Sequence, residues 1–454
     1  MPPTGRSESD TRARYGIVAM LFVVTAINYA DRATLSIAGP ALSKDLGFDA
    51  VTMGYMFSAF GWSYVIGQLP GGYVLDRYGS KHVYFASILA WSTFTLMQGG
   101  LTFLSASAST AAVVLFGLRL MVGLSEAPSF PANGRIVAAW FPANERGTAS
   151  AVFNSAQYFA TVLFAPIMGF LTQSYGWPYP FYFMGALGIL VSFVWLKVIH
   201  NPRDHPRVSP SELDYLVQGG ALVDMDHQTK RPTGAGSATQ GGASIRQLLG
   251  NRMLLGIYIG QYCINTITYF FLTWFPVYLV RQRGFSILNA GFVAALPAIC
   301  GFIGGVLGGV ISDGLVRNGR SLTFSRKAPI VVGMLLSTSM VACNYVDSAP
   351  LVVGIMAFAF FGKGLGALGW AVVSDTSPKE IAGLSGALFN TFGNIAAITT
   401  PIIIGYIVEG TGSFNLALSF VAANALAAVV SYLVIVGDIE RVVLVKAFAP
   451  ADVP

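Results

Sequence analysis

Charged residues are scarce in this sequence. Only 11% of its 454 residues are Asp, Glu, Lys or Arg, whereas a typical soluble domain carries about 25%. A soluble core also rarely grows beyond about 300 residues, and 27 basic and 21 acidic side chains cannot cover a water-soluble fold of this length. Together with a hydrophobic content of 54%, this composition predicts a polytopic membrane protein.

Cysteine and histidine are also rare. The three cysteines, Cys263, Cys300 and Cys343, all fall inside apolar runs, and an odd, buried set cannot form a disulfide framework. The four histidines lie outside the apolar runs or at their edges, so neither a Cys/His metal site nor a histidine relay inside the membrane is expected. P-loop, GxSxG, HExxH and paired CxxC motifs are missing. The chain is therefore expected to be neither an enzyme nor a nucleotide-driven pump, and to need no cofactor or metal.

Long apolar runs dominate the sequence. A helix crosses the ~30 Å hydrocarbon core of a bilayer in about 20 residues, and runs of that length predict an all-α membrane protein with twelve spans. These are expected at residues 16–39, 52–75, 82–104, 109–131, 147–172, 179–199, 253–280, 287–312, 327–346, 350–375, 383–408 and 414–436.

The basic residues predict the orientation. Most of the 27 Lys and Arg residues lie in the N-terminal tail, the even-numbered loops and the C-terminal tail, whereas the odd-numbered loops hold Lys44, Arg281 and Arg283. Because cytoplasmic loops are enriched in Lys and Arg, both termini are expected to be cytoplasmic. The net charge of +6 comes from these short clusters between apolar runs, so no nucleic-acid partner is expected.

An internal repeat divides the chain into two halves. FPANERGTASAVFN, ending at Asn154, matches SPKEIAGLSGALFN, ending at Asn390. We therefore expect two similar six-helix bundles related by an axis along the membrane normal. The predicted parts are a cytoplasmic tail (1–15), an N-terminal bundle (16–199), a cytoplasmic linker (200–251), a C-terminal bundle (252–437) and a cytoplasmic tail (438–454). The Pro- and Gly-rich linker is expected to be a tether, with a short surface helix capped by Ser209.

Five charged residues fall inside predicted spans and away from their ends, where each costs roughly 2.5 to 3.5 kcal/mol on insertion scales and so suggests a function. They are Asp31, Arg32, Arg119, Glu126 and Lys363. Asp31 and Arg32 point about 100° apart on an ideal helix and should have different partners. Arg119 and Glu126 share one face of the fourth span, with Gly123 between them to admit a neighbouring helix. We expect Asp31 to contact Arg119; the alternative is a static ion-pair network that holds the bundle together.

Lys363 lies in the middle of the tenth span, in the glycine-rich motif FFGKGLGALGW. Glycine at that density allows close backbone approach and can break the helix. A lysine at this depth needs an anionic partner, for which a transported carboxylate is the natural candidate. The alternative is that Lys363 snorkels to the interface or pairs with Asp375, although Asp375 is twelve residues and about 18 Å along the helix and therefore too far for a direct contact.

Polar and aromatic residues complete a candidate cavity. They suit a polyhydroxylated solute, although each could instead serve helix packing. They are Tyr29, Tyr64, Gln68, Asn154, Gln157, Gln261, Asn265, Trp370, Asn390 and Asn394. The glycine run 301–309 of the eighth span is interpreted as a packing surface.

The motif GGYVLDRYGSK supplies two glycines and then Asp76, Arg77 and Lys81 on a short cytoplasmic turn. It resembles the signature loop of the major facilitator superfamily, which latches helix ends, and GGVISDGLVRNGRS, with Asp313, is a degenerate copy in the second half. These residues are the expected gating loops.

Longer stretches resemble one family within that superfamily. NYADRATLSIAG, FSAFGWSYVIGQLPGG, SEAPSFPANGRIVAAWFPANERGTA, YFFLTWFPVYLV and FFGKGLGALGWAVVSD are similar to the anion:cation symporter family, and within it to bacterial D-glucarate/galactarate transporters. The resemblance runs from about Tyr15 to Asp438 and implies proton-coupled uptake of a sugar acid across the bacterial inner membrane, with the proton as the coupling ion.

The resemblance also implies residue roles. Asp31 and Glu126 match the family's proton-binding acids, Arg119 the arginine that couples them, and Arg32 the carboxylate-binding arginine. The positions that line the sugar-acid site are matched by Tyr29, Tyr64, Gln157, Gln261, Trp370 and Asn390.

Lys363 departs from relatives that resemble galactonate carriers, which have asparagine there, and a second cation suits a substrate with a carboxylate at each end. The alternatives are a carrier of sugar monoacids or hexuronates, or a sensor that binds without transport. The protein is expected to act as a monomer in the lipid bilayer.

Overall fold

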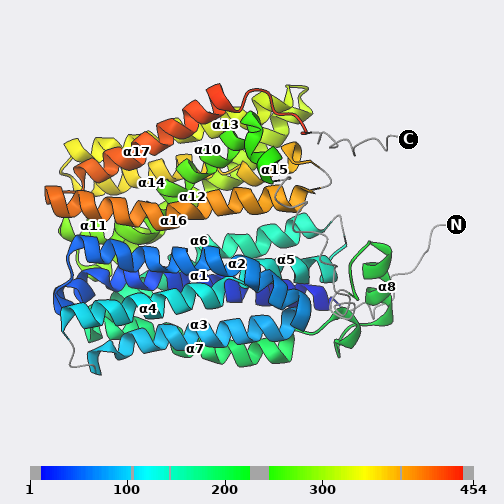
Figure 1. Cartoon of the computed structure of the whole chain (residues 1–454), viewed down its shortest axis with the longest axis horizontal. Helices are drawn as coiled ribbons and strands as arrows, with labels where there is room; N and C mark the ends of the chain where they lie inside the picture. The colour runs from blue at the N-terminus through cyan, green and yellow to red at the C-terminus, as the bar shows by residue number, and fades with distance from the viewer. Residues whose placement is uncertain (1–11, 104–106, 143–144, 225–244, 379–380, 443–454) are drawn as a thin grey trace, which may run out of the picture. The chain divides into compact units, whose positions relative to one another are not determined.

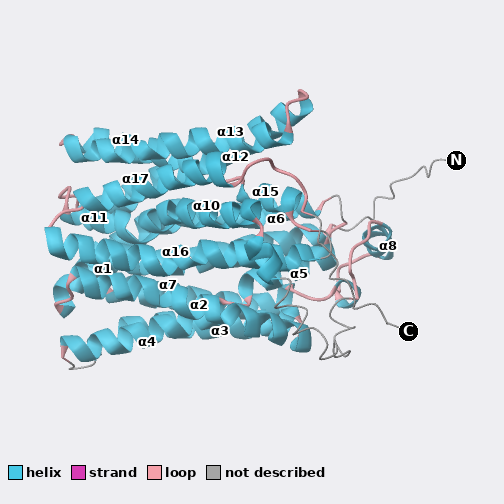
Figure 2. Ribbon diagram, turned by 45° about the horizontal axis from the view of Figure 1, so that its top comes forward, coloured by secondary structure: helices cyan, strands magenta, loops and turns pink. Residues whose placement is uncertain are grey.

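The computed structural model describes residues 12–103, 107–142, 145–224, 245–378 and 381–442, and these residues contain helices but no strands (Figure 2). The first half of the chain forms α1 (Ala13–Leu46), α2 (Ala50–Tyr78), α3 (Ser80–Gly99), α4 (Ala108–Glu126), α5 (Ser129–Trp140), α6 (Arg146–Tyr175) and α7 (Pro178–Val198). The short helix α8 (Pro210–Gln218) follows. The second half forms α10 (Arg252–Tyr269), α11 (Phe275–Arg281), α12 (Ile287–Arg317), α13 (Leu322–Ser337), α14 (Ala349–Leu365), α15 (Gly369–Thr376), α16 (Ala382–Thr411) and α17 (Asn415–Val430).

Every predicted span coincides with a helical segment, and ten segments of the described chain are long and apolar enough to cross a membrane. α2 and α3, which cover the second and third predicted spans, are 29 and 20 residues long but less apolar, and they fall outside that set. The count of twelve spans and the cytoplasmic placement of the termini therefore stay predictions.

The helices group into two compact units. Unit 1 comprises Met1–Pro232, Tyr269–Ile299 and Ala397–Ala417, and unit 2 comprises Thr233–Thr268, Cys300–Ala396 and Leu418–Pro454. In unit 1, α3 packs along α7, α1 along α6, and α2 along α4 (Figure 1). We call the end of unit 1 where α1 begins and α7 ends the linker end, because α8 lies there.

The fourth predicted span does not stop at residue 131. α4 ends at Glu126, a turn at Ala127 and Pro128 interrupts the helix, and α5 continues to Trp140. The interruption packs closely against α2, since a Cβ added at Gly71 would lie 3.1 Å from Cγ of Pro128. Pro128 has no backbone N–H to donate, which accounts for the break between α4 and α5.

α4 also approaches α2 closely one turn earlier. A Cβ on Gly123 would lie 2.4 Å from the carbonyl oxygen of Phe60 and 2.3 Å from Oγ of Ser63. The expectation that Gly123 admits a neighbouring helix is therefore confirmed, and the contact brings the face of α4 that carries Arg119 and Glu126 against α2.

The described first part of the linker is packed rather than free. Ser209 caps α8 by accepting from the backbone N–H of Glu212, as expected. The Glu212 carboxylate then accepts the backbone N–H of Ala13 at 3.0 Å, which fixes α8 to the start of α1. The tether interpretation is wrong for residues 200–224, because their own polar groups bind unit 1; the rest of the linker up to residue 244 lies outside the described residues.

Two later segments of unit 1 pack at the end opposite to α8. Nη2 of Arg281 donates to Oγ of Ser43 at 2.6 Å, and the Trp274 indole donates to the carbonyl oxygen of Pro401 at 3.1 Å. A Cβ on Gly169 would lie 3.0 Å from the carbonyl oxygen of Ile287. Segments from both halves of the chain therefore close tightly on one another at this end.

In unit 2, α12 and α14 cross backbone to backbone. A Cβ on Gly304 would lie 2.2 Å from the carbonyl oxygen of Phe361, and one on Gly308 would lie 2.3 Å from that of Leu365. The glycine run is thus a packing surface, as predicted. α14 ends at Leu365 and α15 begins at Gly369, so the glycine-rich motif does break the tenth span.

Candidate functional site

Two of the five intramembrane charges form an ion pair in unit 1. Nε of Arg32 on α1 donates to Oε2 of Glu126 on α4 at 3.0 Å, and both side chains are buried. The Arg32 guanidinium also lies over the rings of Tyr29, Phe60 and Tyr64, at 4.9, 4.5 and 4.9 Å from their centroids. Contact with several aromatic faces stabilises a cation that is buried away from water.

The expected contact between Asp31 and Arg119 is not a hydrogen bond. Asp31 is 2% exposed, and neither of its carboxylate oxygens has a hydrogen-bond partner; the same is true of Nε of Arg119. The two groups interact through their charges only, and the Trp91 indole faces the Asp31 carboxylate. Arg32 binds Glu126, and Asp31 does not share that ion pair with its neighbour in the chain.

Arg119 is buried on α4, with its guanidinium 5.9 Å from the centroid of Phe60. The static network that we considered for the buried charges therefore exists only in part. Arg32 and Glu126 are joined, while Asp31 and Arg119 interact through their charges without a direct bond. A buried charge that lacks a hydrogen-bonded partner is costly, which is typical of a group that changes protonation or ligand during function.

Only some of the predicted cavity residues of unit 1 lie next to Arg32. Tyr64 is buried and stacks on Phe60 with centroids 5.3 Å apart, and Tyr29 is half-buried beside Arg32. Gln157 lies half-buried on α6 and forms no hydrogen bond or ion pair with Tyr29, Arg32 or Tyr64. Sequence reasoning missed Tyr269, which interacts electrostatically with Arg32 and Tyr64, although it opens the quoted motif YFFLTWFPVYLV.

In unit 2, Lys363 is a buried cation on α14. Its side chain is 7% exposed, its Nζ lies 5.3 Å from the centroid of Phe360, and no carboxylate of the described residues pairs with it. Pairing with Asp375 is wrong, because that carboxylate accepts Nε of Arg326 at 2.8 Å.

α10 and α16 pack closely in unit 2, since a Cβ added at Gly393 would lie 2.6 Å from Nδ2 of Asn265, and each helix carries a pair of hydrogen-bonded amide side chains. Nε2 of Gln261 donates to Oδ1 of Asn265 at 3.4 Å, and Nδ2 of Asn394 donates to Oδ1 of Asn390 at 3.2 Å. Trp370, at the start of α15, is 58% exposed. Its ring packs edge-on against Phe389, with 5.0 Å between centroids.

The predicted gating loops are tied to other helices by arginines that sequence reasoning treated only as orientation signals. Arg135 on α5 pairs with Asp76 at the end of α2, and its Nε donates to Oγ of Ser80 at 3.3 Å. In the second half, Nη1 of Arg326 contacts Asp313 at 3.1 Å. The repeated pattern of an acid after two glycines could have suggested an arginine partner in each half.

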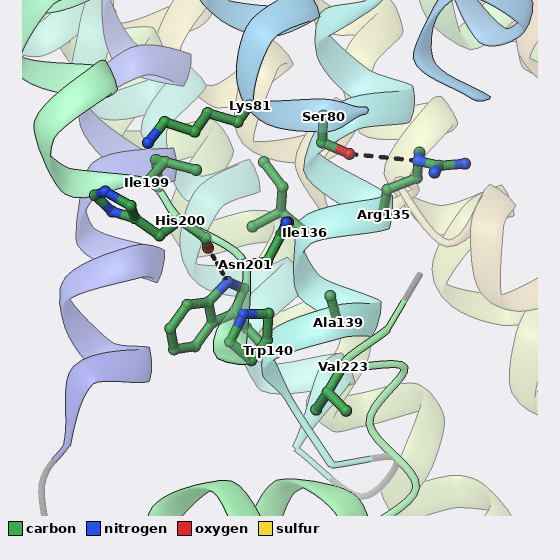
Figure 3. A pocket seen from close by; sticks show the side chains of 11 residues that line it. Ser80, Lys81, Arg135, Ile136, Ala139, Trp140, Ile199, His200, Asn201 and Val223 are labelled. Carbon is green, nitrogen blue, oxygen red and sulfur yellow. Dashed lines mark hydrogen bonds between the residues drawn. The ribbon is translucent and has the colours of Figure 1, made fainter. Parts of the chain in front are cut away.

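Arg77 and Lys81 do not join these ion pairs. The Arg77 guanidinium lies 5.4 Å from the ring centroid of Tyr78. Lys81 lines a recess at the linker end together with Arg135, Trp140 and His200 (Figure 3). Within the described ranges, no three His, Cys, Asp or Glu residues are grouped so that they could hold a metal ion.

Comparisons with known proteins agree on the kind of protein. The model of the Major Facilitator Superfamily matches residues 21–325. The probable galactarate/D-glucarate transporter GudP of Bacillus subtilis is 65% identical, with 98% of this chain and 96% of the relative covered. The probable galactarate/D-glucarate transporter GarP of Escherichia coli is 57% identical over 97% of this chain and 98% of the relative. The crystal structure of a D-xylose-proton symporter shares the fold, with a TM-score of 0.71 and 15% identity over 94% and 98% of the two chains.

Proposed function

Because this chain belongs to the major facilitator superfamily, we propose that it imports a sugar diacid, D-glucarate or galactarate, together with protons by alternating access. It is a multi-pass protein of the bacterial inner membrane. The names of the relatives support the substrate class. The transporter needs no cofactor other than the proton and acts as a monomer.

The observation that carries the substrate proposal is the unpaired, buried Lys363. A buried ammonium without a carboxylate partner costs several kcal/mol, of which an anionic ligand recovers a large part. Lys363 binds one carboxylate of the diacid and Arg32 binds the other. The hydroxyl groups between them are bound by Tyr29, Tyr64, Gln157, Gln261, Trp370 and Asn390.

Proton coupling follows because Glu126 and a carboxylate of the substrate compete for the guanidinium of Arg32. While Glu126 is ionised, its carboxylate occupies Nε of Arg32. Protonation of Glu126 removes that charge, so the guanidinium becomes available to a substrate carboxylate. Asp31, which has no hydrogen-bonded counter-ion, takes the second proton, and Arg119 couples the two acids through its charge. Substrate and protons therefore bind together.

The gating loops hold the cytoplasmic ends of the helices in one of the two states. Asp76 with Arg135, and Asp313 with Arg326, are the ion pairs that must rearrange as access alternates. Arg77 and Lys81 complete the first loop.

Uptake of labelled D-glucarate into proteoliposomes, with and without an inwardly directed pH gradient, tests this function. We expect accumulation only with the gradient, and competition by galactarate that is stronger than competition by galactonate. Preference for the monoacid would overturn the diacid assignment. Binding without uptake or counterflow would identify a sensor.

A further inference from the structure

The two acids of the site are sealed from solvent. Asp31 is 2% exposed and lies near the middle of α1, and Glu126 is 0% exposed at the end of α4, just before the turn that leads into α5. A proton that binds to either acid during transport must later leave it through the interior of the protein. Since hydrocarbon side chains cannot carry a proton, a route must be lined with hydroxyl groups, amides or water.

Buried polar residues continue from the acids along α1 toward the linker end. Asn28 and Thr25 precede Asp31 by three and six residues, which places all three on one face at successive turns. Asn28 and Thr25 are each 1% exposed. The Asn28 side chain faces Glu126, yet neither its Oδ1 nor its Nδ2 has a partner within strict hydrogen-bond geometry.

α5 presents a matching face to α1 and α3, against which it packs. Ser129 and Asn133 follow Glu126 by three and seven residues and are each 1% exposed. Nδ2 of Asn133 donates to Oγ1 of Thr25 at 3.2 Å, which joins the two faces. Between Ser129 and Asn133 the helix α5 advances about 6 Å toward the linker end.

α3 closes the line with a tyrosine. The Tyr84 hydroxyl is fully buried and faces the side chains of Ser129 and Asn133. One turn before it, Ser80 lines the recess that contains Arg135, Trp140 and His200 (Figure 3). The row of buried polar residues therefore extends from the two acids to the recess at the linker end.

The polar groups of this row would lower the stability of the fold if they served packing alone. The Tyr84 hydroxyl, Oγ of Ser129 and Oδ1 of Asn133 have no partner within strict hydrogen-bond geometry, like the Asn28 amide. An unsatisfied buried polar group costs roughly 1 to 3 kcal/mol, and native proteins retain few of them. Placed side by side, they offer the two to four polar contacts that a bridging water needs.

We propose that the proton-release line, formed by Asn28, Ser129, Tyr84, Asn133 and Thr25, carries protons from Asp31 and Glu126 to the linker-end recess. This inference rests on the proposed proton-coupled function. Each step breaks one O–H bond and forms another, as a hydroxyl or a bridging water accepts a proton on its oxygen and passes its own proton on. The amides orient the waters and remain neutral, and nothing is oxidised or reduced.

The test uses Tyr84→Phe, which removes one hydroxyl and keeps the ring that packs against Trp195 at 4.5 Å between centroids. The matched control is Tyr432→Phe in unit 2, where the hydroxyl is equally buried and also lacks a partner. Both variants and the wild type are reconstituted in full-length form. Net glucarate uptake driven by a pH gradient is compared with counterflow at equal pH, while a trapped pH dye records proton arrival.

Counterflow exchanges substrate without requiring proton release, so it separates the line from the binding site. For Tyr84→Phe we expect pH-driven uptake and proton arrival to slow about tenfold, which corresponds to about 1.4 kcal/mol in a barrier. Counterflow in this variant, and every rate in Tyr432→Phe, should stay within about twofold of the wild type. Thr25→Val, which keeps the shape and removes the hydroxyl, should act in the same direction.

Two results would overturn the route. Either wild-type net uptake by Tyr84→Phe, or an equal loss of uptake and counterflow, would remove the hydroxyl from proton transfer. A wild-type protein that shows counterflow but no pH-driven uptake would instead overturn the proposed coupling, so the two failures are distinguishable.

Discussion

Arg32 concentrates several interactions in one side chain. Its guanidinium binds Glu126 and lies over three aromatic rings, and both partners of the ion pair are buried. A buried pair of this kind contributes little net stability, because desolvation offsets most of the attraction. The pair serves instead to let Arg32 change its binding partner, since any change in the charge of Glu126 alters what Arg32 can bind.

Glu126→Gln imitates the protonated acid and should separate transport from coupling. Arg32 would then be permanently available to the substrate, so we expect exchange of glucarate to persist and pH-driven accumulation to disappear. Counterflow and uptake in proteoliposomes measure the two. Glu409→Gln is the control, because Glu409 caps the backbone N–H of Ala50 at the opposite end of unit 1. Normal accumulation by Glu126→Gln would take Glu126 off the proton path.

Lys363→Asn tests recognition of the second carboxylate. Loss of a charge-assisted contact of about 1.5 to 3 kcal/mol should weaken glucarate transport more than about tenfold. A monoacid such as galactonate, which does not use this contact, should be spared. The ratio of kcat/KM for the two substrates is the measurement. If both substrates lose equally, Lys363 serves folding or gating rather than recognition.

At the scale of elements, close helix contacts set the geometry of the buried charges. α4 carries Arg119 and Glu126 on the face that meets α2, and Gly123 lies between them at the point of closest approach. The backbones of α4 at Gly123 and of α2 at Phe60 cannot move apart at this point unless one of the two helices moves. Any side chain at position 123 therefore shifts the charged face as a whole.

Gly123→Ala should destabilise the fold by about 1 to 3 kcal/mol, the usual cost of overpacking. The added Cβ would meet the Phe60 carbonyl oxygen at 2.4 Å. Gly117→Ala on the same helix is the matched control, because nothing lies within 4 Å of its Cβ position. Alanine there should be neutral or stabilising. Thermal unfolding in detergent compares the two, and equal stability would show that the α2–α4 contact yields without cost.

At the scale of the whole molecule, charge arithmetic bounds the stoichiometry. An aldarate is a dianion at neutral pH, because carboxyl groups of this kind titrate near 3 to 4. Bringing two negative charges into a cell at ~100 mV inside-negative costs about 4.6 kcal/mol. Away from their ends, the predicted spans offer two acids, Asp31 and Glu126, and two protons make the translocated load neutral.

We therefore expect uptake that is driven by the pH gradient and nearly insensitive to membrane potential. Recordings on solid-supported membranes should show little steady charge movement when substrate is added. A sustained inward positive current would mean three or more protons per substrate. In that case a third acid takes part, and Asp375 would be the first to test by substitution with Asn.

Helix positions and intramembrane charges could be predicted from the sequence because they follow from local properties. Each predicted span has a helix over it, Ser209 caps α8 as its position suggests, and Gly123 forms the close contact that its spacing indicated. Hydropathy, capping and helical period each depend on residues within a few turns of one another. These features need no knowledge of neighbouring helices.

Pairing was decided only by the tertiary structure. Arg32 and Arg119 have the same charge and lie on different helices, and the spacing within one helix cannot tell which of them reaches Glu126. The same holds for Asp375, whose partner Arg326 lies on another helix, and for the line through Tyr84 and Asn133, whose members come from separate helices. The sequence by itself determined which groups enter the membrane; the rotation of each helix against its neighbours decided which of them meet.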